Sequence, residues 1–154
     1  MTPSRFEIRL ATRDDRAAVL DLMKAAGLAI QGVRADLLGF HLAESPEGSV
    51  LGVACLEYYG REGLLRSVGT HPDARGQGIG QDLVRAVEST AVAEGLQRMV
   101  LLTTDAMAWF TRLGYIPVPW DSAGVYVQRS SQFAGGCPTS AVAMIRSLTA
   151  PTGE

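Results

Sequence analysis

Residues 68–80 are the most informative segment of the chain and read Val68-Gly69-Thr70-His71-Pro72-Asp73-Ala74-Arg75-Gly76-Gln77-Gly78-Ile79-Gly80. It joins an apolar strand to an amphipathic helix through a loop with glycine at every second position. Glycine lets backbone N–H groups approach an anion closely, and a helix beginning near Gly80 adds the positive end of its dipole. The loop therefore predicts a phosphate or pyrophosphate site. A tight glycine turn without a ligand remains the plainer alternative.

Two other phosphate-binding motifs do not fit this loop. A dinucleotide-binding fingerprint would place its third glycine where Gln81 stands, and it would follow a parallel strand–helix–strand unit rather than a meander. A nucleotide-triphosphate loop needs lysine followed by serine or threonine, and Lys24, the only lysine, belongs to a different helix. Neither class of nucleotide-binding protein is therefore favoured.

The segments around the loop alternate between strand and helix patterns. Period-two or continuous apolar runs predict strands, and apolar spacings of three and four predict helices. The predicted strands are Phe6–Leu10, Phe40–Glu44, Val50–Tyr59, Leu64–Thr70, Met99–Thr103, Tyr115–Val118 and Val142–Leu148; the predicted helices are about fourteen residues after Thr12, Gly80–Gly95 and Ala106–Leu113. Leu28–Leu38 is compatible with a helix or a loop. An antiparallel meander followed by strand–helix–strand units predicts an α/β (α+β) sandwich with one sheet.

Length and charge limit the class of protein. A chain of 154 residues with a net charge of −2 is expected to form one domain, residues 1–154. Fourteen basic and sixteen acidic residues are spread without runs, which argues against a nucleic-acid partner. The N-terminus lacks a signal-peptide pattern, and no run is apolar enough for a membrane span. We expect a cytoplasmic protein whose partners are small molecules.

The two cysteines do not indicate a metal site. Cys55 lies in an apolar run and is predicted to be a buried small hydrophobe, whereas Cys137 precedes Pro138. Neither belongs to a CxxC pair or has a histidine at metal-ligand spacing. No metal is expected.

The glycine loop also carries a family resemblance. Arg75-Gly76-Gln77-Gly78-Ile79-Gly80 resembles the Arg/Gln-x-x-Gly-x-Gly/Ala motif of the GNAT superfamily of N-acetyltransferases. The resemblance implies a mixed central sheet of about seven strands flanked by about four helices, and acetyl-CoA as cofactor. It also implies that the backbone of Val68 and Thr70 pairs with the pantetheine arm. The amides of Gln77–Gly80 would hold the pyrophosphate, with Arg75 opening the loop.

Two further blocks narrow the resemblance. Residues 101–115, which include the paired Thr103 and Thr104 and a Trp-Phe helix, are similar to the acetyltransferase domain of N-acetylglutamate synthases. Leu64–Ser67, with the C-terminal residues 131–141, resembles small acetyltransferases found with arsenic-resistance genes. This implies an acceptor that is an amino acid or a toxic analogue, such as a glutamate analogue bearing an arsinate or phosphinate group.

The usual acid and base of this family are absent. Many members have a tyrosine where Phe110 aligns, which leaves that position as part of the cofactor site without a proton donor. Many also have a glutamate at the start of the fourth strand, where this chain has Leu64 and Leu65. Glu57 is our candidate base, although a solvated strand end is the plainer interpretation. Solvent, or Ser67 acting through water, could protonate the thiolate.

Other positions are candidates for the oxyanion and the acceptor. The N–H of Val68 could stabilise the developing oxyanion. Arg66 could hold a carboxylate, arsenic or phosphorus oxyanion, or it could be a surface charge. The remaining residues expected around the acceptor are Ser67, Thr103, Thr104, Ser130 and Phe133.

We therefore expect an acetyl-CoA-dependent N-acetyltransferase that acts on a small amino acid or toxic analogue. Acetylation of glutamate in ordinary metabolism, acetylation of proteins and a non-catalytic coenzyme-A-sensing domain are the alternatives. The oligomeric state is not written in the sequence, but proteins of this resemblance often form homodimers, and residues 120–139 could contribute to such an interface.

Overall fold

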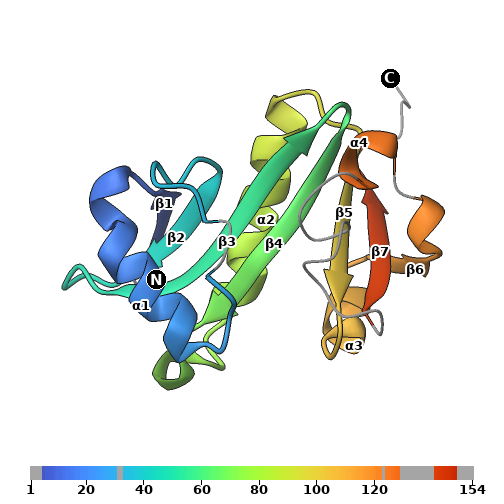
Figure 1. Cartoon of the computed structure of the whole chain (residues 1–154). Helices are drawn as coiled ribbons and strands as arrows, with labels where there is room; N and C mark the ends of the chain where they lie inside the picture. Colours follow the sequence, from blue (N-terminus) through green and yellow to red (C-terminus); the bar gives the residue numbers. More distant parts are fainter. Residues whose placement is uncertain (1–4, 31–32, 123, 129–140, 149–154) are drawn as a thin grey trace. The chain divides into compact units, whose positions relative to one another are not determined.

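The computed structural model describes residues 5–30, 33–122, 124–128 and 141–148, and it has a seven-stranded sheet in the order β1-β2-β3-β4-β5-β7-β6 (Figure 1). The strands are β1 (Glu7–Leu10), β2 (Phe40–Glu44), β3 (Val50–Tyr59), β4 (Glu62–Thr70), β5 (Arg98–Thr103), β6 (Ile116–Val118) and β7 (Val142–Ser147). The helices are α1 (Arg16–Ala25), α2 (Ile79–Ala93), α3 (Met107–Arg112) and α4 (Val125–Gln128), with 3-10 turns η1 (Arg13–Asp15), η2 (Pro72–Ala74) and η3 (Trp120–Ser122).

The sheet is mixed, as predicted. β2 pairs antiparallel with β1 and β3, and β7 pairs antiparallel with β5 and β6. β4 and β5 are parallel. An α/β fold with one mixed sheet is therefore confirmed.

The chain forms two compact units. Unit 1 comprises Met1–Leu56 and Ser67–Val87, and unit 2 comprises Glu57–Arg66 and Glu88–Glu154. β3, β4 and α2 each contribute residues to both units. The units are described separately below.

The core of unit 1 lies between α1 and the β2–β3 hairpin. Val19, Leu22 and Met23 recur at helical spacing on α1, and all three are buried. They pack in one apolar cluster with Phe40 and with Cys55, which is buried as predicted. Burial of this helix face is what holds α1 on the sheet.

A charge cluster joins β1, β2 and η1 in unit 1. The guanidinium of Arg9 donates two 2.9 Å hydrogen bonds to Asp15 and bonds of 3.1 and 3.2 Å to Glu44. This contact lowers the pKa of Asp15 from 3.8 to about 2, and it also lowers the pKa of Glu44. One arginine therefore links the edge strand to the neighbouring strand and to the turn before α1.

In unit 2, β5 is paired along its full length with β7 but only at its start with β4. Six residue pairs connect Arg98–Thr103 to Val142–Ser147, and the two strands lie side by side in Figure 1. The β4 register joins Glu62–Leu64 to Arg98–Val100. The apolar core of this unit contains Leu64, Val100, Val127 and Ala143. β5 is thus a central strand, as its continuous apolar run predicted.

Two buried carboxylates connect separate segments of unit 2. Glu88 on α2 accepts hydrogen bonds from the hydroxyl of Tyr115 and from Arg146 on β7. Glu62 on β4 contacts Arg98 and accepts a 2.6 Å bond from the N–H of Gly124, just before α4. Buried charges of this kind are tolerated because each has an ionic partner and further hydrogen bonds.

Differences from the predicted elements include those in α1, in β4 and in residues 28–38. α1 has ten residues rather than about fourteen, because Arg13–Asp15 forms a 3-10 turn in which Asp15 accepts a 2.8 Å bond from the Thr12 N–H. β4 begins at Glu62, since Glu62 and Gly63 already pair with β5. The described residues of 28–38 contain no helix.

Candidate functional site

The glycine loop of unit 1 lies between the short turn η2 and the helix α2. His71 precedes η2, and its Nδ1 accepts a 3.1 Å hydrogen bond from the N–H of Asp73. Arg75 ends this turn with an extended backbone and is exposed. The chain then passes through Gly76, Gln77 and Gly78 into α2, as predicted.

Gly76 and Gly78 need to be glycine because of their backbone conformation. Their φ angles are +84° and +81°, which side chains with a Cβ rarely adopt. A Cβ at either position would have no atom within 4 Å, so the space around this part of the loop is open. The conformation explains the alternate glycines, and the open space leaves room for a ligand.

The start of α2 presents backbone donors next to this loop. The first intrahelical bond runs from the N–H of Asp82 to the carbonyl of Gly78. The preceding N–H groups, including those of Ile79 and Gly80, therefore have no acceptor within the helix. Ile79 is buried against β3, where Gly52 has no side chain and a Cβ would lie 2.9 Å from the Ile79 side chain. The helix start is thus anchored by packing, and its amides without a helical acceptor are the kind of donors that bind an anion.

Ser67 has an unusual backbone in β4. Its φ is +56°, the left-handed region that costs a non-glycine residue roughly 1 kcal/mol or more. Such residues concentrate at functional sites, where the surrounding structure holds them. Val68 and Thr70, the predicted pantetheine partners, follow on the same strand and are partly buried.

A second group of candidate residues lies in unit 2, around Arg66. This residue is only 8% exposed, so it is not the surface charge that the sequence also allowed. Its Nη1 donates a 3.1 Å hydrogen bond to Oε2 of Glu57, and the hydroxyl of Tyr59 donates a 2.7 Å bond to Oε1 of the same carboxylate. Glu57 is therefore an ion-paired, partly buried group rather than a solvated strand end.

Tyr59 was not among the residues that we expected in the site. Side chains two positions apart in a strand point to the same face, so Glu57 and Tyr59 could have been grouped from their spacing on β3. The sequence did not show which cation would join them. That partner, Arg66, comes from the next strand.

The residues after β5 have mainly structural contacts. Thr103 Oγ1 accepts a 3.0 Å hydrogen bond from the N–H of Ala106 at the start of α3, while Thr104 is exposed. Phe110 is buried and makes edge-to-face contacts with Trp109 and Tyr115, at ring distances of 4.8 and 5.7 Å. Core packing therefore explains the contacts of Phe110 with these two rings.

Some predicted positions cannot be located. Ser130, Phe133 and Cys137 lie outside the described residues. In the part of the chain that is described, no three His, Cys, Asp or Glu side chains gather as a metal site would require. None of the helices described is long and apolar enough to cross a membrane.

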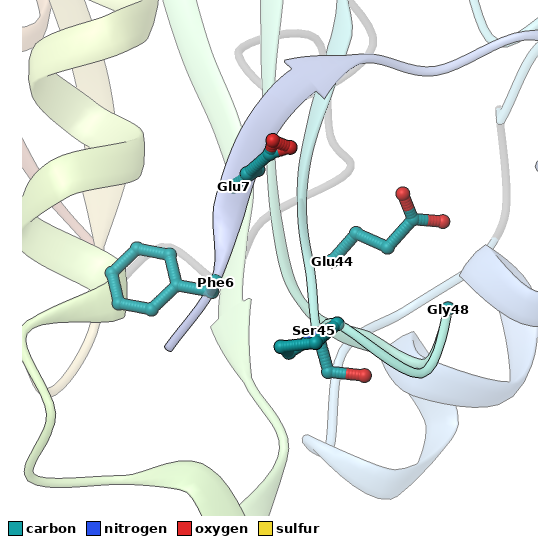
Figure 2. A pocket seen from close by; sticks show the side chains of 6 residues that line it. Phe6, Glu7, Glu44, Ser45 and Gly48 are labelled. Atoms are coloured by element: carbon teal, nitrogen blue, oxygen red, sulfur yellow. The ribbon is translucent and has the colours of Figure 1, made fainter. Parts of the chain in front are cut away.

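A pocket elsewhere in unit 1 contains none of the predicted residues. It has a volume of about 400 Å³ between the start of β1 and the β2–β3 turn, and it is lined by Phe6, Glu7, Glu44, Ser45, Pro46 and Gly48. Figure 2 shows Phe6 and Glu7 on one side of it, with Glu44, Ser45 and Gly48 on the other.

This chain belongs to the acetyltransferase (GNAT) family, which it matches over residues 8–115. The amino-acid acetyltransferase of Ralstonia nicotianae is 32% identical to it over 118 residues, which are 71% of this chain and 26% of that protein. A second relative, the amino-acid acetyltransferase of Aeromonas salmonicida, is 29% identical over 82% of this chain and 30% of its own length. The chain thus spans less than a third of the curated relatives that it matches.

Solved structures share the fold. The N-acetylglutamate synthase of Neisseria gonorrhoeae, complexed with coenzyme A and N-acetyl-glutamate, aligns with a TM-score of 0.83 at 20% identity over 97% of this chain and 36% of that one. A Mycobacterium tuberculosis protein in complex with coenzyme A aligns with a TM-score of 0.74 at 22% identity, covering 93% of this chain and 99% of that one.

Proposed function

We propose that this protein transfers the acetyl group of acetyl-CoA to the amine of a small amino acid or of a toxic amino-acid analogue. The observation that carries the proposal is the loop before α2, where Gly76 and Gly78 have positive φ and open space where a Cβ would lie, next to the first N–H groups of the helix. This geometry fits the pyrophosphate of coenzyme A. Family membership supplies the reaction class, and the relatives named amino-acid acetyltransferase support an amino-acid acceptor.

The cofactor is assigned to residues of the loop and of β4. Amides of Gln77–Gly80 bind the pyrophosphate, and Arg75 adds a positive charge at the entrance of the loop. The backbone groups of Val68 and Thr70 bind the pantetheine amides, because alternate residues of a strand present them to the same edge. Phe110 contributes an apolar contact. When bound, the cofactor supplies an acetyl group activated as a thioester.

The acceptor is assigned to Arg66, whose guanidinium suits a carboxylate or an arsenic or phosphorus oxyanion. Thr103, Thr104, Ser130 and Phe133 complete the proposed acceptor site. An amino acid offers both the amine that reacts and the anion that Arg66 recognises. A glutamate analogue bearing an arsinate or phosphinate group is the finer form of this proposal, and glutamate itself is the metabolic form, which the named relatives favour.

Acetyl transfer needs a neutral amine, a donor for the developing oxyanion and a proton for the thiolate. The N–H of Val68 is proposed for the oxyanion, and Ser67 acting through water for the thiolate. Two routes for the amine proton are water and the carboxylate of Glu57. Both Glu57 oxygens already accept hydrogen bonds, from Arg66 and Tyr59, which favours water.

The test is acetyl-CoA turnover, followed by thiol release, with glutamate, other amino acids, phosphinothricin, an arsenic-bearing glutamate analogue and a lysine peptide as acceptors. Turnover of a free amino acid or analogue supports the proposal, and the ratio between glutamate and the analogues decides between metabolism and detoxification. Preference for the peptide would indicate a protein acetyltransferase. Tight acetyl-CoA binding without any turnover would indicate a sensing domain, which the missing hydroxyl at Phe110 would then explain.

A further inference from the structure

Tyr59, Glu57 and Arg66 form a chain of hydrogen-bonded polar groups in unit 2. The Tyr59 hydroxyl lies 2.7 Å from Glu57 Oε1, and Arg66 Nη1 lies 3.1 Å from Glu57 Oε2. Each carboxylate oxygen therefore has its own donor. The Glu57 side chain is 24% exposed, whereas the Arg66 side chain is 7% exposed.

A guanidinium that is this deeply buried needs a partner of opposite charge. Removing one member of a buried pair leaves the other charge uncompensated, and the cost is far larger than for a surface pair. Glu57 therefore fixes where the Arg66 guanidinium can lie. Tyr59 in turn fixes the carboxylate, because its hydrogen bond restricts rotation of the Glu57 side chain.

The contact between Glu57 and Arg66 differs from the other arginine cluster of the chain. Arg9 donates hydrogen bonds to Asp15 from two guanidinium nitrogens and to Glu44 from two. This bidentate geometry is typical of a purely structural contact. Glu57 meets the Arg66 guanidinium through Nη1. This bond fixes the position of Nη1, and Arg66 has further contacts of its own.

The backbone beside Arg66 is also held in a special conformation. Arg66 directly precedes Ser67, whose φ of +56° interrupts the regular strand. A strained backbone next to a buried, oriented cation is the combination expected where a polar ligand is bound rather than where a strand is only being packed.

We propose that Glu57 and Tyr59 are positioning residues that orient the guanidinium of Arg66 and thereby make the enzyme selective for acceptors with a carboxylate or similar oxyanion. This inference rests on the proposed function, in which Arg66 binds the acceptor. It assigns Glu57 to acceptor recognition instead of proton abstraction.

The experiment compares acceptors that differ by one charge. Initial rates are measured at saturating acetyl-CoA with three acceptors: glutamate, glutamine and the α-amide of glutamate. Glutamine lacks the side-chain carboxylate of glutamate, and the α-amide lacks the α-carboxylate. In Tyr59→Phe we expect the KM for glutamate to rise about fivefold, which corresponds to the net contribution of about one ordinary hydrogen bond, with kcat within about twofold. The KM for acetyl-CoA stays unchanged. The ratio of kcat/KM for glutamate to kcat/KM for one of the two amides falls by the same factor as the KM for glutamate rises.

Tyr58→Phe is the matched control. It removes the same hydroxyl from the neighbouring residue of β3, whose side chain is 47% exposed. Its acceptor KM and selectivity should equal those of the wild-type protein. Glu57→Gln should raise the KM for glutamate more than Tyr59→Phe does, while the pH profile of kcat keeps its acidic limb.

Three results would overturn the inference. Glu57→Gln could lower kcat by orders of magnitude and remove the acidic limb without changing KM, which would make Glu57 the base. Tyr59→Phe could leave acceptor selectivity as in the wild type, which would refute positioning while the proposed function stands. A folded wild-type protein that acetylates neither an amino acid nor an analogue would refute the proposed function and this inference together. If Glu57→Gln does not fold, Tyr59→Phe decides, since it retains the charge pair.

Discussion

Tyr115 donates a 2.8 Å hydrogen bond to Glu88, although 27 residues separate them in the sequence and both are almost completely buried. Tyr115→Phe removes only this hydroxyl and leaves the carboxylate with one partner fewer. We expect the free energy of unfolding to fall by about 1–3 kcal/mol. Urea unfolding measures it, with Tyr58→Phe as the exposed control. A Tyr115→Phe protein as stable as the wild type would show that the buried bond contributes nothing net.

The glycine loop gives a prediction for cofactor binding. Gly78→Asp places a negative charge where the pyrophosphate is proposed to lie, and we expect acetyl-CoA affinity to fall about 100-fold or more. Gly95→Asp is the control, because Gly95 has a similar φ of +83° and open space but follows the opposite end of α2. Calorimetry with acetyl-CoA measures both. Equal affinity of the two folded variants would refute the cofactor assignment.

The Arg9 cluster predicts how stability depends on acid. Because Arg9 lowers the pKa of Asp15 from 3.8 to about 2, the folded state releases this proton more readily than the unfolded state does. The stabilisation is complete above about pH 4 and is lost as the pH falls towards about 2. Arg9→Met should cost about 1 kcal/mol at pH 7, since the Arg9 side chain is 38% exposed.

Urea unfolding of wild type and Arg9→Met between pH 7 and pH 3 tests this. The difference between the two proteins should shrink as the pH approaches 3. Arg13→Met, which changes an exposed arginine of the same turn, should behave like the wild type at every pH. A difference that stays constant with pH would contradict the role of the Asp15 charge.

His41 acts in a separate pH range. It is 4% exposed on β2, and burial lowers its pKa below the ordinary value of 6.5. As the pH falls below about 6.5, the unfolded chain takes up this proton first, so the folded state loses stability. His41→Gln should flatten the stability profile between pH 7 and pH 5. A wild-type profile that is already flat there would refute the assignment.

Features that depend on neighbouring residues were predictable from the sequence. Alternating and helical apolar spacings located the strands and the two long helices, and the glycines at 76 and 78 predicted the loop because positive φ is a local requirement. The long-range polar contacts were not predictable. Glu88 meets a residue 58 positions away in Arg146, and such pairing depends on the packing of the whole unit.

In the candidate site, too, single residues could be predicted from the sequence but their long-range contacts could not. Glu57 and Arg66 were each identified as candidates, but nothing in their spacing predicted that they bind each other. The left-handed backbone of Ser67 had no signal either, because a serine in an apolar run predicts an extended strand.

The short strand β6 ends the strand order with three residues, of which Pro117 cannot donate a backbone hydrogen bond. Ile116 beside it is 57% exposed and would otherwise favour contact with another molecule. A strand this brief, with a missing donor, is a poor template for the addition of a strand from another copy. The three residues that complete the sheet therefore also disfavour edge-to-edge aggregation of the protein at high concentration.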